Sequence, residues 1–157
     1  MTLFPADGDL LDWSAYTRVL LATSRPGGGI RLNPSQVKAF EEAVLADRFY
    51  VCTPFRLEAR FSARTAGDFA SLSEDLDGFR QANADAETWL LAERAQRDLA
   101  EDPTVSHRVK LADLLVAAIA SQRQLGVLHY DADYDLIAAH SKLEFESAWI
   151  APRGSID

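Results

Sequence analysis

The sequence predicts an α/β fold in which a central parallel sheet is flanked by helices. Short apolar runs that suit buried strands lie at residues 10–11, 49–52, 127–130 and 148–151. Segments in which apolar residues recur at helical spacing separate these runs, and such alternation is typical of a parallel sheet. The sequence contains no internal repeat, low-complexity tract or linker, so we expect residues 1–157 to form one domain around one core.

Capping residues and spacing place the helices of the first half. A helix begins at Ser14, and a loop rich in glycine and proline follows at residues 24–34. Ser35 can cap the next helix. The apolar face of that helix consists of Val37, Phe40, Val44 and Leu45. Thr53 and Pro54 combine a capping side chain with a proline in the first turn, which predicts the start of a third helix.

Helices also dominate the second half. Two helical stretches cover residues 68–80 and 84–100, and a polar loop at residues 102–110 follows them. The clearest helix has apolar residues at positions i, i+3, i+4, i+7 and i+8, which form one face. These residues are Leu111, Leu114, Leu115, Ala118 and Ile119. Gly126 ends that region, and a short helix over residues 134–139 follows the next strand.

Charge and composition limit the possible functions. The net charge of −8 opposes binding to a polyanion, because lysine and arginine usually supply the affinity for nucleic acids. A divalent cation held by carboxylates, or a basic partner, would reverse the local sign. No run approaches the roughly 18 apolar residues of a membrane helix, and residues 1–9 lack the lysine or arginine of a secretory signal. We therefore expect a cytoplasmic protein that does not enter a membrane.

Several common kinds of site are absent from the sequence. Cys52 is the only cysteine, so no disulfide framework is expected. The histidines His107, His129 and His140 do not have the ligand spacing of a structural zinc site. The glycine run at residues 27–29 is not followed by the Lys-Ser/Thr pair of a phosphate-binding loop, and no G-x-S-x-G elbow of a serine hydrolase is present.

Four acidic residues stand at positions where a site can form. Asp12 and Asp131 each follow a predicted strand, and sites in open α/β sheets lie beyond the carboxyl ends of the strands. Asp113 lies in the first turn of the clearest helix, and Glu58 lies one turn into the helix that begins at Thr53. If these carboxylates converge, they need a cation, and hard oxygen ligands select Mg²⁺ or Mn²⁺. Such an ion can activate water and stabilise charge on a phosphate.

Each of these acids also has a purely structural interpretation. Asp12 can cap the helix that begins at Trp13, and Asp113 can complement a helix dipole. Glu58 can pair with a nearby arginine, and Asp131 can stabilise a turn. The pattern of residues leaves open whether the four side chains converge.

Five stretches of the chain resemble the PIN-domain ribonucleases of the VapC toxin type. They are LLDWSAYTR (10–18), LEARFSAR (57–64), HRVKLADLLVAAIA (107–120), VLHYDADYDLIA (127–138) and WIAPRGSI (149–156). They occur in the family's order and span nearly the whole chain. The third and fourth stretches together are fairly specific for the family.

The resemblance implies a three-layer α/β/α fold of the PIN type and a metal-dependent endoribonuclease. It implies that a water activated by Mg²⁺ or Mn²⁺ cleaves RNA in line and leaves 5′-phosphate and 3′-hydroxyl ends. It assigns the catalytic and metal-binding acids as Asp12, Glu58, Asp113 and Asp131. Asp133 would be a peripheral metal ligand, and Ser14 would orient Asp12 by a hydrogen bond.

The resemblance also implies partners. Toxins of this type are held by a VapB-type antitoxin, whose C-terminal peptide crosses the active-site groove, and they form homodimers. Arg18, Arg108 and Lys110 lie near the acid-bearing segments and are candidates to contact RNA phosphates. Ordinary surface charge is the alternative interpretation of these three residues.

Two departures from the family pattern keep other functions open. Trp13 stands where a threonine commonly follows the first acid, and His129 stands where many members have a threonine before the fourth. Trp13 favours a PIN-like binding module that is catalytically weak or inactive. A nuclease that uses the same acids on DNA is a third possibility.

Overall fold

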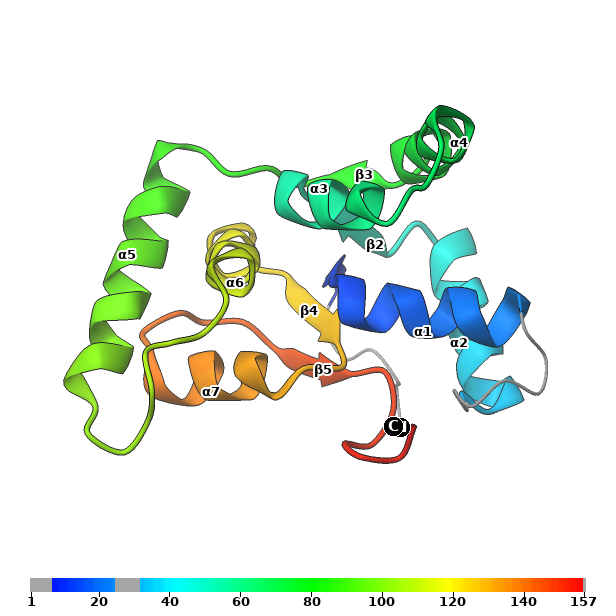
Figure 1. Ribbon diagram of the computed structural model, residues 1–157. Helices are drawn as coiled ribbons and strands as arrows, with labels where there is room; N and C mark the ends of the chain where they lie inside the picture. Colours follow the sequence, from blue (N-terminus) through cyan, green and yellow to red (C-terminus); the bar gives the residue numbers. More distant parts are fainter. Residues whose placement is uncertain (1–6, 25–31, 157) are drawn as a thin grey trace.

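Five parallel strands form one sheet at the centre of the molecule (Figure 1). The computed structural model describes residues 7–24 and 32–156. The strands are β1 (Asp9–Leu11), β2 (Phe49–Val51), β3 (Arg80–Gln81), β4 (Gly126–His129) and β5 (Ser147–Trp149). Their order across the sheet is β3-β2-β1-β4-β5. β1 is therefore central, and its Leu10 pairs with Tyr50 on one side and Val127 on the other.

Seven helices in the described part of the chain surround this sheet. They are α1 (Trp13–Ser24), α2 (Pro34–Leu45), α3 (Thr53–Phe61), α4 (Ala66–Asp77), α5 (Ala86–Glu101), α6 (Leu111–Arg123) and α7 (Ala132–His140). In Figure 1, α1 and α2 lie on one side of the strands and α5, α6 and α7 on the other, while α3 and α4 lie beside β2 and β3. This arrangement confirms the predicted α/β/α class. None of the described helices combines the length and the apolar character needed to cross a bilayer.

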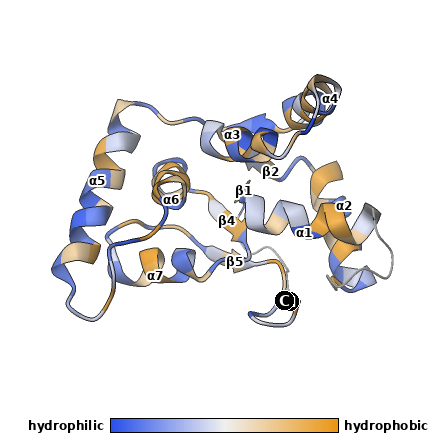
Figure 2. Cartoon of the chain, in the orientation of Figure 1, coloured by the Kyte–Doolittle hydropathy of each residue, from blue (hydrophilic) through white to orange (hydrophobic). Residues whose placement is uncertain are grey.

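The apolar core surrounds the two central strands. Leu10 and Leu11 of β1, and Val127 and Leu128 of β4, have no exposed surface. Such continuous apolar runs are expected where both faces of a parallel sheet are covered. Residues 116–120 of α6 are all buried, because this helix lies between the sheet and α5. Figure 2 shows α6 as mainly hydrophobic and α5 as largely hydrophilic, which agrees with the burial of α6.

The second helix is capped by a residue other than the expected one. α2 begins at Pro34, and the side chain of Asn33 accepts a hydrogen bond from the backbone N–H of Gln36 at 2.9 Å. Ser35, the expected cap, lies inside the first turn and donates to Asn33. Proline favours the first helical position, which places the cap on the residue before it. Of the loop expected at 24–34, positions 25–31 lie outside the described residues.

The helix expected at residues 68–80 also has different ends. α4 is capped by the hydroxyl of Thr65 and ends at Asp77. Arg80 and Gln81 instead form the edge strand β3, which pairs with β2. Both side chains are exposed and polar, so no apolar pattern marks these residues as a strand.

Candidate active site

The carboxyl ends of β1 and β4 bring two of the expected site residues together. β1 and β4 are adjacent and parallel, and Leu11 pairs with Leu128. Asp12 directly follows β1, and Asp131 follows shortly after β4. The backbone N–H of Asp12 donates to the carbonyl of Leu128 at 3.0 Å, which ties the end of β1 to β4. Asp12 and Asp131 therefore lie at the same edge of the sheet.

Both carboxylate oxygens of the buried Asp12 accept hydrogen bonds. Oδ2 accepts from the backbone N–H of Ser14 at 2.8 Å and from the hydroxyl of Ser14, so Asp12 caps α1. Oδ1 accepts from the hydroxyl of Tyr134 at 2.7 Å. The Ser14 hydroxyl oxygen also accepts from the backbone N–H of Tyr130 at 2.9 Å. The hydrogen bonds by which Asp12 caps α1 thus also hold the Asp12 carboxylate at the edge of the sheet.

Asp113 lies in the first turn of α6 and is 3% exposed. Its Oδ1 lies 3.4 Å from the Tyr134 hydroxyl, so one phenol bridges Asp113 and Asp12. Its Oδ2 is buried and has no hydrogen-bond partner among the described residues. Burial and the negative charge of Asp12 raise the pKa of Asp113 to about 7, against the opposing charge of Lys110. A cation bound to this carboxylate would favour its ionised form.

Asp131 and Asp133 complete a tight acidic group with Asp113. One carboxylate oxygen from each of the three residues lies within 4.8 Å of the others. Asp131 caps α7, because its Oδ1 accepts from the N–H of Asp133 at 3.0 Å, and its Oδ2 accepts from Lys110. Burial alone would raise the pKa of Asp131, but the hydrogen bonds from Lys110 and from this N–H bring it below its ordinary value.

Glu58 lies on α3 at the margin of this group. The residue is half-buried, and burial and the charge of Asp12 raise its pKa. Two nearby arginines have other partners, because Arg56 pairs with Asp77 and Arg60 lies over the ring of Phe69. Glu58 also lines an apolar cleft of about 650 Å³ between α3, α5 and α6. It is therefore adjacent to the acids but not part of the tight group.

The residues at this edge fit a divalent cation. All the candidate ligands are carboxylate oxygens, which suit hard ions such as Mg²⁺ and Mn²⁺. The buried Oδ2 of Asp113 lacks a hydrogen-bond donor in the described structure, and an ion would satisfy it. The three carboxylates are far apart in the sequence: Asp12 follows β1, Asp113 lies on α6 and Asp131 precedes α7. Only the folded chain brings them together.

Comparisons with known proteins identify the family. No family model matches the chain. Ribonuclease VapC18 of Mycobacterium tuberculosis is 39% identical over 124 residues, which cover 78% of this chain and 89% of that protein. The chain belongs to the VapC ribonuclease family. Ribonuclease VapC21 of the same organism is 32% identical over 147 residues, which cover 93% of this chain and 96% of that protein.

Solved structures of VapBC proteins share the fold of this VapC family member. The DNA-bound VapBC from Salmonella typhimurium superposes with a TM-score of 0.64 at 14% identity, covering 92% of this chain and 98% of that chain. VapBC-5 of Mycobacterium tuberculosis, from the VapBC family of toxin-antitoxin systems, gives a TM-score of 0.56 at 21% identity and covers 89% and 98%. At these identities the likeness concerns the fold.

His129, a departure from the usual VapC pattern, holds the backbone of Asp131. The His129 side chain is fully buried, and its Nδ1 accepts from the N–H of Asp131 at 3.1 Å. Nε2 therefore carries the proton and donates to the Ser147 hydroxyl at 2.7 Å. Ser147 donates in turn to Asp135. Burial lowers the pKa of His129 to about 4, so a neutral ring connects Asp131 to β5.

Sequence reasoning did not find the role of Tyr134. Its hydroxyl reaches Asp12 across 122 positions of the chain, and that contact depends on the adjacency of β1 and β4. The signal in the sequence is a tyrosine on the first turn of the helix that Asp131 caps. An aromatic residue there predicts core packing, whereas a hydroxyl buried with it needs a polar partner.

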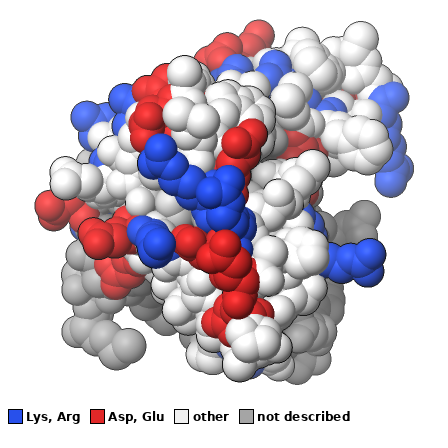
Figure 3. Space-filling view, turned by 90° about the vertical axis from the view of Figure 1, so that its left-hand side faces the viewer, with Lys and Arg blue, Asp and Glu red and all other residues white. Residues whose placement is uncertain are grey.

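The candidate RNA contacts have three different environments. The Arg18 guanidinium donates to the carbonyl of Ser14 at 2.8 Å and lies 4.0 Å from the centre of the Tyr130 ring. Arg108 is exposed on the loop before α6, and Lys110 binds the acids directly. Figure 3, which views the side of the molecule that bears α5, shows basic and acidic side chains interspersed rather than a continuous basic surface.

Proposed function

We propose that this VapC family member is a toxin endoribonuclease that uses Mg²⁺ or Mn²⁺. The observation that carries the proposal is the convergence of Asp12, Asp113 and Asp131 at one edge of the sheet, with Tyr134 bridging the first two. The curated relatives VapC18 and VapC21 are named ribonucleases, which supports RNA as the substrate. An RNA substrate in turn favours the cytoplasm as the place of action.

The residues of the chain have distinct parts in this reaction. Asp113, Asp131 and Asp133 would hold the ion, because their oxygens lie within 4.8 Å of one another. Asp12 and Glu58 would be the further acidic ligands that the resemblance assigns. When bound, the ion supplies water activation and neutralises charge that develops on the phosphate. Ser14 and Tyr134 keep Asp12 in one orientation.

The packing of Trp13 supports the active nuclease over the inactive binding module. Its ring packs edge-on against Phe55, with centroids 6.4 Å apart, and against Tyr16 at 6.2 Å. The tryptophan is thus part of the apolar contact between α1 and α3. Asp12 and Ser14, the two neighbours of Trp13, still form their hydrogen bonds to each other. A tryptophan at position 13 is therefore compatible with this orientation of Asp12.

The proposed partners follow from the surface beside the acids. The apolar cleft next to Glu58 is lined by Leu57, Trp89 and Leu115 and suits an apolar segment of a VapB-type antitoxin. A basic residue of that segment would pair with the carboxylates, and the net charge of −8 favours such a partner. We expect the toxin to form a homodimer, which light scattering on the purified chain measures directly.

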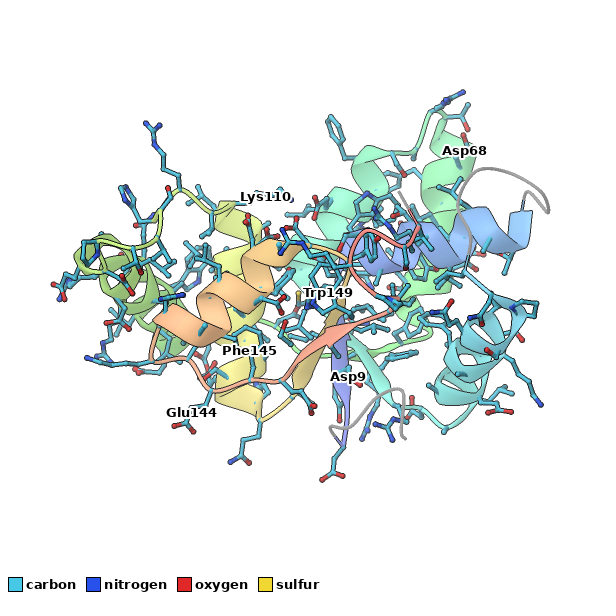
Figure 4. The ribbon with its side chains drawn as sticks, turned by 90° about the horizontal axis from the view of Figure 1, so that it is seen from below. Asp9, Asp68, Lys110, Glu144, Phe145 and Trp149 are labelled. Carbon is cyan, nitrogen blue, oxygen red and sulfur yellow. The ribbon has the colours of Figure 1, made fainter. Side chains whose placement is uncertain are left out.

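Asp113→Asn tests the proposed activity. This variant keeps the size of the side chain and removes the charge that the ion requires. Asp68→Asn is the matched control, because Asp68 also lies in the first turn of a helix but is exposed on α4 (Figure 4). With single-stranded RNA and Mn²⁺, we expect cleavage by the wild type and by Asp68→Asn and none by Asp113→Asn.

Circular dichroism should show the same fold for the wild type, Asp113→Asn and Asp68→Asn. The cleavage assay then separates the alternative functions. Cleavage of single-stranded DNA in preference to RNA would support the DNA-directed nuclease. Binding of RNA by the wild type without cleavage at any Mn²⁺ or Mg²⁺ concentration would support the binding module. Unchanged cleavage by Asp113→Asn would remove Asp113 from the site.

A further inference from the structure

Lys110 places a cation directly on the acidic group. It is the residue before α6, and its ammonium donates a hydrogen bond to Oδ2 of Asp131. The same nitrogen lies 3.8 Å from the buried Oδ2 of Asp113. Figure 4 shows Lys110 near the starts of α6 and α7. Asp113 lies in the first turn of α6, and Asp131 caps α7. The pKa of Lys110 lies above its ordinary value because Asp131 accepts its hydrogen bond, so the ammonium is charged at neutral pH.

The ammonium and a divalent ion would need the same carboxylates. Asp113 and Asp131 contact Lys110 and are also two of the three residues whose oxygens lie within 4.8 Å of one another. A Mg²⁺ ion binds its oxygen ligands at about 2.0–2.1 Å, so an ion between these oxygens fills the space that separates them. Two cations in direct contact with the same pair of carboxylates would repel each other strongly.

The contact of Lys110 is weak enough to exchange. Its side chain is 62% exposed, so the ammonium can move into water without leaving a buried charge behind. Ion pairs of exposed lysines typically contribute about 0.2–1 kcal/mol, and the lysine stem is flexible. A divalent ion carries twice the charge and would also satisfy the Oδ2 of Asp113, which Lys110 approaches without a hydrogen bond.

We propose that Lys110 is the resident cation of the metal-free site and that a divalent ion displaces it from Asp113 and Asp131. The inference rests on the proposed function, because it takes these acids as the metal ligands. Lys110 then has two opposite effects on the protein. It reduces the repulsion among the acids when no ion is bound, and it lowers the affinity for the ion by competing with it.

Calorimetric titration of the metal-free protein with Mn²⁺ tests this exchange without relying on cleavage. Lys110→Gln removes the competing cation, and we expect the dissociation constant of this variant for Mn²⁺ to fall by up to about fivefold, which corresponds to about 1 kcal/mol. Lys110→Arg keeps a cation and should bind Mn²⁺ no more tightly than the wild type. Lys142→Gln removes one charge at a 93% exposed position beyond the C-terminal end of α7 and should change the dissociation constant less than twofold.

Thermal unfolding of the same proteins gives a second measurement. In EDTA, Lys110→Gln should unfold at a lower temperature than Lys142→Gln, because its acids repel one another without a counter-charge. Saturating Mn²⁺ should then raise the unfolding temperature of Lys110→Gln more than that of the wild type.

The results of these experiments test the displacement of Lys110 by the ion separately from the proposed nuclease activity. Equal or weaker Mn²⁺ binding by Lys110→Gln, with normal binding by the wild type, would overturn the exchange and leave the nuclease proposal standing. Equal gains in affinity for Lys110→Gln and Lys142→Gln would also overturn it, because net charge alone would then be the cause. No binding of Mn²⁺ to any of the proteins would overturn both proposals.

Discussion

Asp9 is a buried carboxylate at the end of β1 opposite to the acidic group (Figure 4). It has no exposed surface, and neither of its oxygens has a hydrogen-bond partner among the described residues. Burial raises its pKa from 3.8 to about 6, although the charge of Arg48 opposes the change and that of Glu146 adds to it. Replacing Asp9 by asparagine removes the charge and keeps the shape of the side chain.

The pKa of Asp9 sets the size and the sign of the expected effect. The difference between about 6 in the folded protein and 3.8 in the unfolded chain corresponds to about 3 kcal/mol at 1.36 kcal/mol per pH unit. The folded protein binds the proton more tightly, so the contribution of Asp9 to stability falls as the pH rises from about 4 to about 6. Above that window Asp9 is ionised in both states and its full destabilising effect is present.

We therefore expect Asp9→Asn to be more stable than the wild type at neutral pH. The gain in the free energy of unfolding should approach about 3 kcal/mol near pH 7.5 and shrink toward zero near pH 4. Urea denaturation of both proteins across this range measures the difference, and the titration of all other groups cancels in it. Asp7→Asn, two positions earlier and exposed, is the control and should have little effect. A variant less stable than the wild type at neutral pH, or a gain independent of pH, would refute the reasoning.

Three further predictions concern the acidic group. Tyr134→Phe removes the hydroxyl that donates to Asp12 at 2.7 Å, and it should lower the free energy of unfolding by about 1.5–3 kcal/mol in urea titrations; an unchanged midpoint would contradict the bridge. His129→Phe leaves the N–H of Asp131 without its acceptor, so it should lower stability by about 1–3 kcal/mol and weaken Mn²⁺ binding, whereas a loss of stability alone would limit His129 to packing. At a hundredfold excess over its dissociation constant, Mn²⁺ should add about 2.7 kcal/mol to the stability of the wild type. EDTA should remove that gain, and an equal gain in Asp113→Asn would place the ion elsewhere.

Local patterns in the sequence were sufficient to predict most of the fold. The apolar residues of α6 recur at helical spacing because this helix is buried against the sheet. The apolar runs of β1 and β4 follow from burial on both faces of the parallel sheet. β3 could not be predicted, because Arg80 and Gln81 are exposed and owe their strand conformation to pairing with β2. The intrinsic strand propensity of its residues is a poor guide to such an edge strand, because the strand is stabilised by hydrogen bonds to a distant part of the chain.

The candidate site was predicted as a set of acids, but not as a set of contacts. Strand ends and helix starts identify Asp12, Asp113 and Asp131 as candidates. Their mutual distances depend on which strands are neighbours, and a single sequence does not encode that order locally. The contacts of Lys110 and Tyr134 depend on the same order, so their involvement emerges only in three dimensions.

The pairing of β1 with β4 has a consequence for synthesis of the chain. β1 and Asp12 are made before β4 and the cap of α7, and the Tyr134 hydroxyl follows Asp12 by 122 positions. During synthesis Asp12 therefore has the Ser14 contact first and gains the Tyr134 contact only after β4 has been made. A chain cut before residue 131 lacks both Asp131 and Tyr134, so the Asp12 carboxylate loses the hydroxyl that joins it to Asp113.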